Sequence, residues 1–234
     1  MLRSGITVGG WTMGSRVAGL IRDVVLANAV GASAGADAFF VAFKIPNFLR
    51  RLFGEGAFAQ AFVPVFSETR EKQGVESVQQ LINQVAGRFG LILLLITVLG
   101  VLGAPWIAHL FAPGFANDPG KLALTADLLR WTFPYLFFIS LVAFSGGILN
   151  SVGRFAIPAA TPIFLNLSLI GAALFITPLV TPSVLGLAIG VFVAGVVQLL
   201  IQFPALRMAG LLPRPSLASD HPGVSKILRL MVPA

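Results

Sequence analysis

Long apolar segments that recur along the whole chain constrain its fold more than any other feature. The stretch 91–102 contains no charged residue, and the stretch 184–201 is almost entirely Val, Leu, Ile, Ala and Gly. Across the 234 residues the mean hydropathy is +0.90 and only 11% are charged, about half the share that soluble domains carry. Since an apolar run of about 20 residues is the length of one membrane-spanning helix, the sequence predicts an all-α, polytopic transmembrane helix bundle.

Glycines, prolines and charged residues divide this bundle into six complete spans and the start of a seventh. The predicted helices cover residues 5–30, 37–66, 81–112, 123–150, 156–179 and 184–207, and the seventh begins near Val224. The second is the least apolar, because four charged residues interrupt it and Pro46 and Pro64 offer places to bend. We expect residues 1–210 to form a six-helix lobe, and residues 211–234 to hold a connector and the start of a truncated seventh helix.

Lysines and arginines are distributed unevenly between alternate loops. If the N-terminus is cytoplasmic, only Lys121 lies on the outer side. The cytoplasmic side collects eight: Arg3, Arg70, Lys72, Arg88, Arg154, Arg207, Arg214 and Lys226. This bias predicts a cytoplasmic N-terminus and requires the charged second segment to cross the membrane. It also explains the net charge of +7 without a nucleic-acid partner.

The sequence contains few residues in patterns typical of catalytic or metal sites. It has no cysteine, and His109 and His221 lack acidic neighbours at ligand spacing, so we expect both to be solvated or interfacial. No Ser-His-Asp set, Walker loop or Rossmann fingerprint is present. The two longer loops, an amphipathic one over 67–84 and a Pro-rich one over 212–223, are too small to be catalytic domains. The chain is therefore predicted to be no enzyme and to need no metal or cofactor.

The first two spans nevertheless carry eight ionisable residues between Arg16 and Glu55. Each costs roughly 2.5–3.5 kcal/mol at membrane depth, so such groups usually face a cavity or a partner. Asp23 could pair with Arg50 or Arg51 across the two helices, which leaves a net positive, water-filled pocket. Guanidinium groups match phosphate oxygens and stay charged when desolvated, so a diphosphate fits this pocket.

A plainer interpretation of the same charges stays open. Arg50 and Arg51 could extend to the cytoplasmic interface, Asp37 could lie at the outer boundary, and Arg22 with Asp23 could be a simple ion pair. Small-residue pairs such as Gly186 with Gly190 are interpreted as sites of close helix packing.

Several segments together resemble one known family. They are SRVAG at 15–19, RD at 22–23, ADAFFVAFKIPN at 36–47, LRRLFGEGAF at 49–58 and QAFVP at 60–64. These segments are similar to those of the MurJ, or MviN, lipid II flippases of the MOP exporter superfamily. The resemblance extends along all 234 residues.

The resemblance implies a bacterial inner-membrane protein that moves lipid II, the undecaprenyl-diphosphate-linked disaccharide-pentapeptide used for peptidoglycan, to the outer face by alternating access. It implies that the chain is the N-terminal lobe of a MATE-like two-lobe transporter and works with a missing C-terminal lobe, among membrane lipids. The implied substrate-binding residues are Arg16, Arg22, Arg50, Asp23, Asp37 and Glu55, with Ser15, Asn47 and Arg51 as weaker candidates. Alternatives are another polyprenyl-diphosphate oligosaccharide flippase, a MATE-like exporter, or a non-transporting scaffold for cell-wall enzymes.

Overall fold

The computed structural model describes residues 2–50, 58–218 and 221–231, and all regular secondary structure within these ranges is helical. The α-helices are α1 (Leu2–Val30), α2 (Ala34–Arg50), α3 (Phe58–Leu102), α4 (Ala104–Phe111), α5 (Pro119–Thr132), α6 (Tyr135–Ser151), α7 (Ala156–Gly171), α8 (Val184–Leu200), α9 (Gln202–Met208) and α10 (Pro222–Met231). Short turns η2 (Pro113–Phe115), η3 (Ala172–Ile176) and η4 (Thr177–Leu179) join some of them. The prediction of an all-α helix bundle is confirmed.

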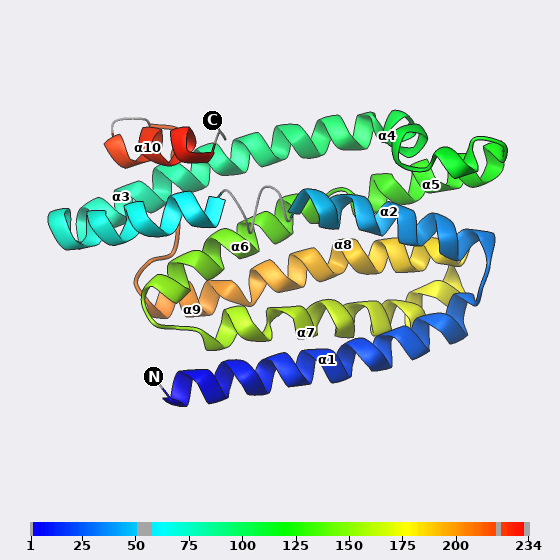
Figure 1. The fold of residues 1–234 in the computed structure, drawn as a ribbon, viewed down its shortest axis with the longest axis horizontal. Coiled ribbons are helices and arrows are strands. Elements are labelled where there is room, and N and C mark those ends of the chain that lie inside the picture. The colour runs from blue at the N-terminus through cyan, green and yellow to red at the C-terminus, as the bar shows by residue number, and fades with distance from the viewer. Residues whose placement is uncertain (1, 51–57, 219–220, 232–234) are drawn as a thin grey trace.

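The helices form an elongated bundle in which most axes follow the long direction of the molecule (Figure 1). The first helix, α1, lies at one edge and packs against α7, which packs against α8. The short α2 packs across α5, α8 and α6, and α3 packs against α6 and α10. Both the N-terminus and α10 lie toward the same end of the bundle (Figure 1).

Four helical segments in the described part of the chain are long and apolar enough to cross a membrane. They are Gln60–Leu102, Pro119–Ser151, Ala156–Leu179 and Val184–Met208, and they correspond to the third to sixth predicted spans. The first predicted span corresponds to α1, whose 29 residues extend over roughly 43 Å at 1.5 Å per residue. The charges that define the candidate site lower the hydropathy of α1 and α2.

The loop predicted over residues 67–84, between the second and third spans, is wrong. Helix α3 continues through this stretch, and residues 51–57 of the second predicted span lie outside the described residues. Pairs such as Lys72 with Glu68, 2.9 Å apart and four residues apart in the chain, stabilise this polar helix. At Gly74 the backbone adopts φ 81° and ψ −174°, which glycine adopts at little cost, and α3 turns back on itself (Figure 1).

Two hydrophobic clusters hold the bundle together. One is formed mainly by buried residues of α2, α5, α6 and α8, and the other by α3, α6, α9 and α10. Close approach between helices depends on small residues, as predicted for Gly186 and Gly190. A Cβ at Gly186 would lie 2.6 Å from Thr177 Cα, and one at Gly190 would lie 2.4 Å from Ala172 Cβ.

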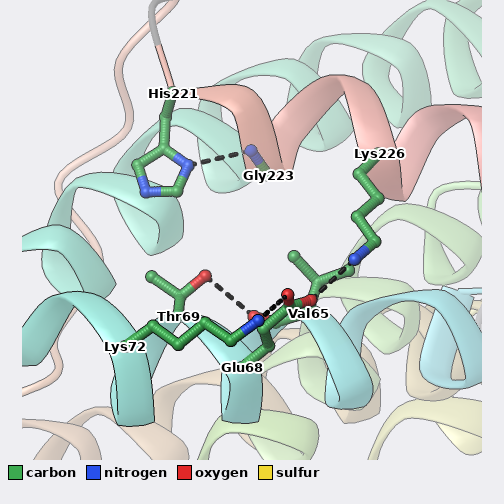
Figure 2. A network of polar contacts seen from close by, with 7 residues as sticks. All are labelled: Val65, Glu68, Thr69, Lys72, His221, Gly223 and Lys226. Atoms are coloured by element: carbon green, nitrogen blue, oxygen red, sulfur yellow. Dashed lines mark hydrogen bonds and ion pairs between the residues drawn. The ribbon is translucent and has the colours of Figure 1, made fainter.

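The last described helix, α10, packs against α3. Lys226 Nζ lies 2.6 Å from Glu68 Oε2, and Lys72 holds the other carboxylate oxygen at 2.9 Å (Figure 2). Just before α10, His221 Nδ1 accepts from the Gly223 amide at 3.1 Å. His221 is only 6% exposed, so the expectation of a solvated side chain is wrong for it, because the connector folds this ring against α3. A position at the membrane interface stays a prediction. That α10 begins a seventh span stays a prediction.

Candidate functional site

Arg22 is the best-anchored member of the predicted charge cluster. Its Nε and Nη2 donate to Asp23 Oδ1 at 3.0 and 2.7 Å, and its Nη1 donates to Asn166 Oδ1 on α7 at 2.8 Å. The Arg22 side chain is 25% exposed. A guanidinium has five N–H donors, so these three bonds leave two donors for a further acceptor. The group is thus fixed in orientation while part of its binding capacity remains open.

Asn166 connects the two helices that carry this arginine. It is 5% exposed, and its Nδ2 donates to the Ser15 carbonyl oxygen on α1 at 3.1 Å. Glycines let the helices approach, since a Cβ at Gly14 would already touch Ile163 at 3.4 Å, and one at Gly19 would lie 3.8 Å from Asn166 Nδ2. Ser15, Arg22 and Asp23 are therefore brought together, and Ser15 takes part through its backbone.

Arg16 is the other predicted arginine of α1. It is exposed, and it lies six residues before Arg22, roughly 9 Å along the helix axis. If α1 crosses the bilayer as predicted, an exposed guanidinium at this position reaches water, an anion or another polypeptide rather than lipid chains. Arg16 and Asp23, seven residues apart and both exposed, share this face as predicted.

Asn47 lines a cavity of about 460 Å³ enclosed by α2, α3, α6, α7, α8 and α9. Its other polar lining residues include Asn150, Thr161, Gln198 and Gln202. Its described lining is thus rich in amides and contains no Asp, Glu, Lys, Arg or His. Helix α7 contributes to both the Arg22 contact and this cavity, because Asn166 bonds to Arg22 on α1 while Leu165 lines the cavity.

Asp37 belongs to a different contact, near the turn between α1 and α2. Its Oδ2 lies 2.7 Å from Lys121 Nζ on α5, and Lys121 in turn sits 4.1 Å from the centre of the Phe115 ring. Asp118 caps α5 by accepting from the Lys121 amide at 2.9 Å. The ion pair connects α2 to α5. Both a position at the outer boundary of the membrane and a substrate contact stay predictions for Asp37.

Three predicted site residues fall wholly or partly outside the described part of the chain. Arg51 and Glu55 lie between α2 and α3 in the undescribed range, and of Arg50 only the backbone is described. The predicted partnership of Asp23 with Arg50 or Arg51 is therefore untested. The carboxylate of Asp23 does receive Arg22, as the simple ion-pair interpretation implied.

Sequence reasoning missed the uncharged part of the site. Gln198 Nε2 donates to the Thr161 carbonyl at 3.0 Å, and Gln202 Nε2 donates to Thr161 Oγ1 at 2.9 Å. Both glutamines are almost fully buried, and within the described residues their Oε1 atoms have no hydrogen-bond partner. The available signal was the presence of amide side chains such as Asn166 in spans that are otherwise apolar, where unpaired polar groups are costly.

Comparison with known proteins agrees with the predicted family. A family model described as lipid II flippase MurJ matches residues 26–234. The chain belongs to the MurJ family. The probable lipid II flippase MurJ of Vibrio cholerae serotype O1 is 48% identical over 100% of this chain, and the lipid II flippase MurJ of Burkholderia cenocepacia is 41% identical over 100% of it. These relatives are named as flippases, in agreement with the prediction of a membrane transport protein and not an enzyme.

A solved MurJ structure has the same fold. It is a lipid II flippase MurJ in an inward closed conformation, and it matches 97% of this chain with a TM-score of 0.77 and 30% sequence identity. This chain covers 46% of that structure, and likewise 46% of the Vibrio and Burkholderia relatives. It therefore spans less than half the length of the MurJ proteins that it matches. As a member of this family, the chain is part of a multi-pass membrane protein.

Proposed function

We propose that this chain forms the N-terminal lobe of a flippase that carries lipid II from the cytoplasmic to the outer face of the bacterial inner membrane. The single observation that carries the proposal is the Arg22 guanidinium. Asn166 and Asp23 fix it with three hydrogen bonds, and two of its donors stay open on a helix that is long enough to cross the bilayer. A diphosphate is a matching acceptor, because its oxygens take forked, charge-assisted hydrogen bonds.

The remaining members of the site take complementary roles in this proposal. Arg16, and Arg50 from α2, add positive charge for the diphosphate, while Asp23 and Glu55 orient and balance the guanidinium groups. The amide-lined cavity next to Asn47 suits an uncharged, hydroxyl-rich portion of the substrate. Preorganised donors of this kind bind without reorganisation. Ser15, Asp37 and Arg51 are retained as weaker candidates.

The proposed topology has six spans with a cytoplasmic N-terminus. The first span is α1, and the second is α2 continued by the first half of α3 beyond its undescribed link. The others are the second half of α3 with α4, α5 with α6, α7 with η3 and η4, and α8 with α9. Residues 1–210 form the lobe and 211–234 the connector toward a second, C-terminal lobe, which completes the cavity and permits alternating access.

Complementation of cells depleted of their own lipid II flippase tests the proposal. Full-length protein that carries Arg16→Ala or Arg22→Ala should accumulate normally on an immunoblot and fail to support growth. Arg22→Lys should rescue growth only partly, because lysine keeps the charge but loses the forked geometry. Arg130→Ala is the matched control, since Arg130 pairs with Asp127 on the exposed surface of α5. Wild-type growth of both alanine variants at the site would refute the assignment.

A binding experiment separates the remaining alternatives. Purified full-length protein should bind lipid II in preference to polyprenyl diphosphates that carry other oligosaccharides, and Arg22→Ala should weaken that binding. Equal binding of all of them would indicate a broader polyprenyl-diphosphate flippase. Growth that survives neutralisation of the cavity charges but fails after changes to surface loops would indicate a scaffold.

A further inference from the structure

A second hollow lies away from the charge cluster, where α9 and the connector meet α3. One part is an apolar groove of about 540 Å³ lined by α3, α6, α8, α9 and the connector, including Gly90, Phe203 and Pro213. The other is a polar pocket of about 510 Å³, whose lining includes Arg207 and Arg214. Leu212 lines both, so the apolar groove and the basic pocket are neighbours.

The local sequence builds this junction. Helix α9 ends in a Schellman motif, in which the Gly210 amide donates to the Arg207 carbonyl at 3.0 Å and the Leu211 amide to the Leu206 carbonyl at 3.0 Å. Gly210 has φ +70°, the left-handed conformation that this motif needs. The turn places Arg207 just before the connector and Arg214 just after its start.

Polar residues of α3 then hold the connector over the groove. Asn83 Oδ1 accepts from the Arg214 amide at 2.7 Å, and the Asn83 carbonyl accepts from the Ser216 amide at 2.9 Å. Gln79 Nε2 donates to the Leu212 carbonyl at 3.0 Å. The contact is tight, because a Cβ at Gly87 would lie 2.2 Å from the Ser216 carbonyl oxygen. These hydrogen bonds therefore hold the connector in place along one side of the groove.

The polar pocket has unused binding capacity of a defined kind. Arg207 and Arg214 are exposed and are not ion-paired with any described residue. Gln79 Nε2 donates to two acceptors, so its Oε1 is assigned as an acceptor, and this oxygen is buried without a partner in the described part of the chain. Two cations beside one unmatched acceptor favour an anion that also carries a hydroxyl donor.

We propose that this hollow is a binding site for an anionic glycerophospholipid with a hydroxyl-bearing headgroup. The phosphate lies between Arg207 and Arg214, a headgroup hydroxyl donates to Gln79 Oε1, and an acyl chain fills the apolar groove beneath the connector. The groove is within the size range of roughly 300–1,000 Å³ typical of small-molecule sites. Basic residues at a membrane surface attract anionic lipids. The site is separate from Arg16 and Arg22 and does not depend on flippase activity.

Native mass spectrometry of the delipidated full-length protein tests this site with three dioleoyl lipids and one free headgroup. The lipids are phosphatidylglycerol, phosphatidylmethanol, which has the same charge but no headgroup hydroxyl, and phosphatidylethanolamine; the free headgroup is glycerol phosphate. We expect one retained phosphatidylglycerol with at least tenfold preference over phosphatidylethanolamine, a weaker preference over phosphatidylmethanol, and no competition by equimolar glycerol phosphate. Each basic residue contributes roughly fivefold at an anionic lipid surface.

Two kinds of variant assign the two parts of the site. Arg207→Gln with Arg214→Gln should abolish the preference for phosphatidylglycerol, whereas lysine at both positions should retain it; Arg130→Gln with Arg229→Gln is the charge-matched control. Thermal melting of each variant establishes that it is folded.

Groove filling tests the apolar part. Gly90→Phe should lower retention of every lipid, because Gly90 lines the groove and nothing lies within 4 Å of its Cβ position. Gly171→Phe, at another open position, should not. Equal retention of phosphatidylglycerol and phosphatidylethanolamine, or full competition by glycerol phosphate, would overturn the proposal. The proposal would also be overturned if the full-length protein retained no lipid because another part of the protein fills the groove.

Discussion

Replacing Asn166 by leucine should loosen α1 from α7 and release the Arg22 guanidinium. The change removes the bond from Arg22 at 2.8 Å and the bond to the Ser15 carbonyl at 3.1 Å. In a soluble protein one charge-assisted and one neutral hydrogen bond would together contribute about 2–4.5 kcal/mol. Between membrane helices the average is about 0.6 kcal/mol per bond and the maximum about 1.7, because the unfolded chain in the membrane finds other partners. We therefore expect a loss of about 1–3 kcal/mol in the free energy of unfolding.

A double-mutant cycle measures the part that belongs to the Arg22–Asn166 pair. Unfolding free energies from steric trapping in bicelles are compared for Arg22→Met, Asn166→Leu, the double variant and the parent, and the coupling should be about 1 kcal/mol. Asn28→Leu is the control, because Asn28 Nδ2 donates to the Val24 carbonyl of its own helix at 3.0 Å. A coupling below about 0.3 kcal/mol, within the error of additivity, would refute the view that Asn166 positions Arg22.

Three further changes test other contacts. Gly186→Ala should lower the free energy of unfolding by about 1–3 kcal/mol in a melting experiment, because the new methyl group meets the Thr177 backbone at 2.6 Å; an unchanged melting temperature would contradict this packing. Lys121→Gln should cost at most about 1 kcal/mol, since its partner Asp37 is 64% exposed, and a larger loss would indicate a buried role. Gln202→Leu should leave melting nearly unchanged but weaken complementation, and full growth would exclude the amide-lined cavity from the substrate path.

The parts of the fold that could be predicted from sequence are those set by local composition. The spans 156–179 and 184–207 agree closely with the helical segments Ala156–Leu179 and Val184–Met208, because apolar runs between prolines and glycines define their own ends. The stretch 67–84 was mistaken for a loop because its polarity marked it as outside the membrane. Polarity does not exclude helix, and here the helix turns only at Gly74.

The chemistry of the site was less predictable, because it depends on which helices meet. The charges were visible in the sequence, since ionisable groups are rare in apolar spans. The partner of Arg22 was not, because Asn166 lies 144 residues away and nothing local pairs α1 with α7. The same holds for Thr161, whose contacts with two glutamines arise only after α7 packs against α8 and α9.

The exposed face of α1 is consistent with the proposal that this chain forms a lobe packed beside a second one. Met13 and Leu20 are 71% and 67% exposed on α1, while Arg16 and Asp23 are exposed on the same helix. Lipid would accept the apolar residues but would penalise each charge by roughly 2.5–3.5 kcal/mol, and bulk water would penalise the apolar residues. A surface that mixes both fits a boundary between a water-filled cavity and a neighbouring helix. In the proposed flippase the second lobe supplies that neighbour, and movement of the two lobes would then change which side of the membrane Arg16 and Arg22 can reach.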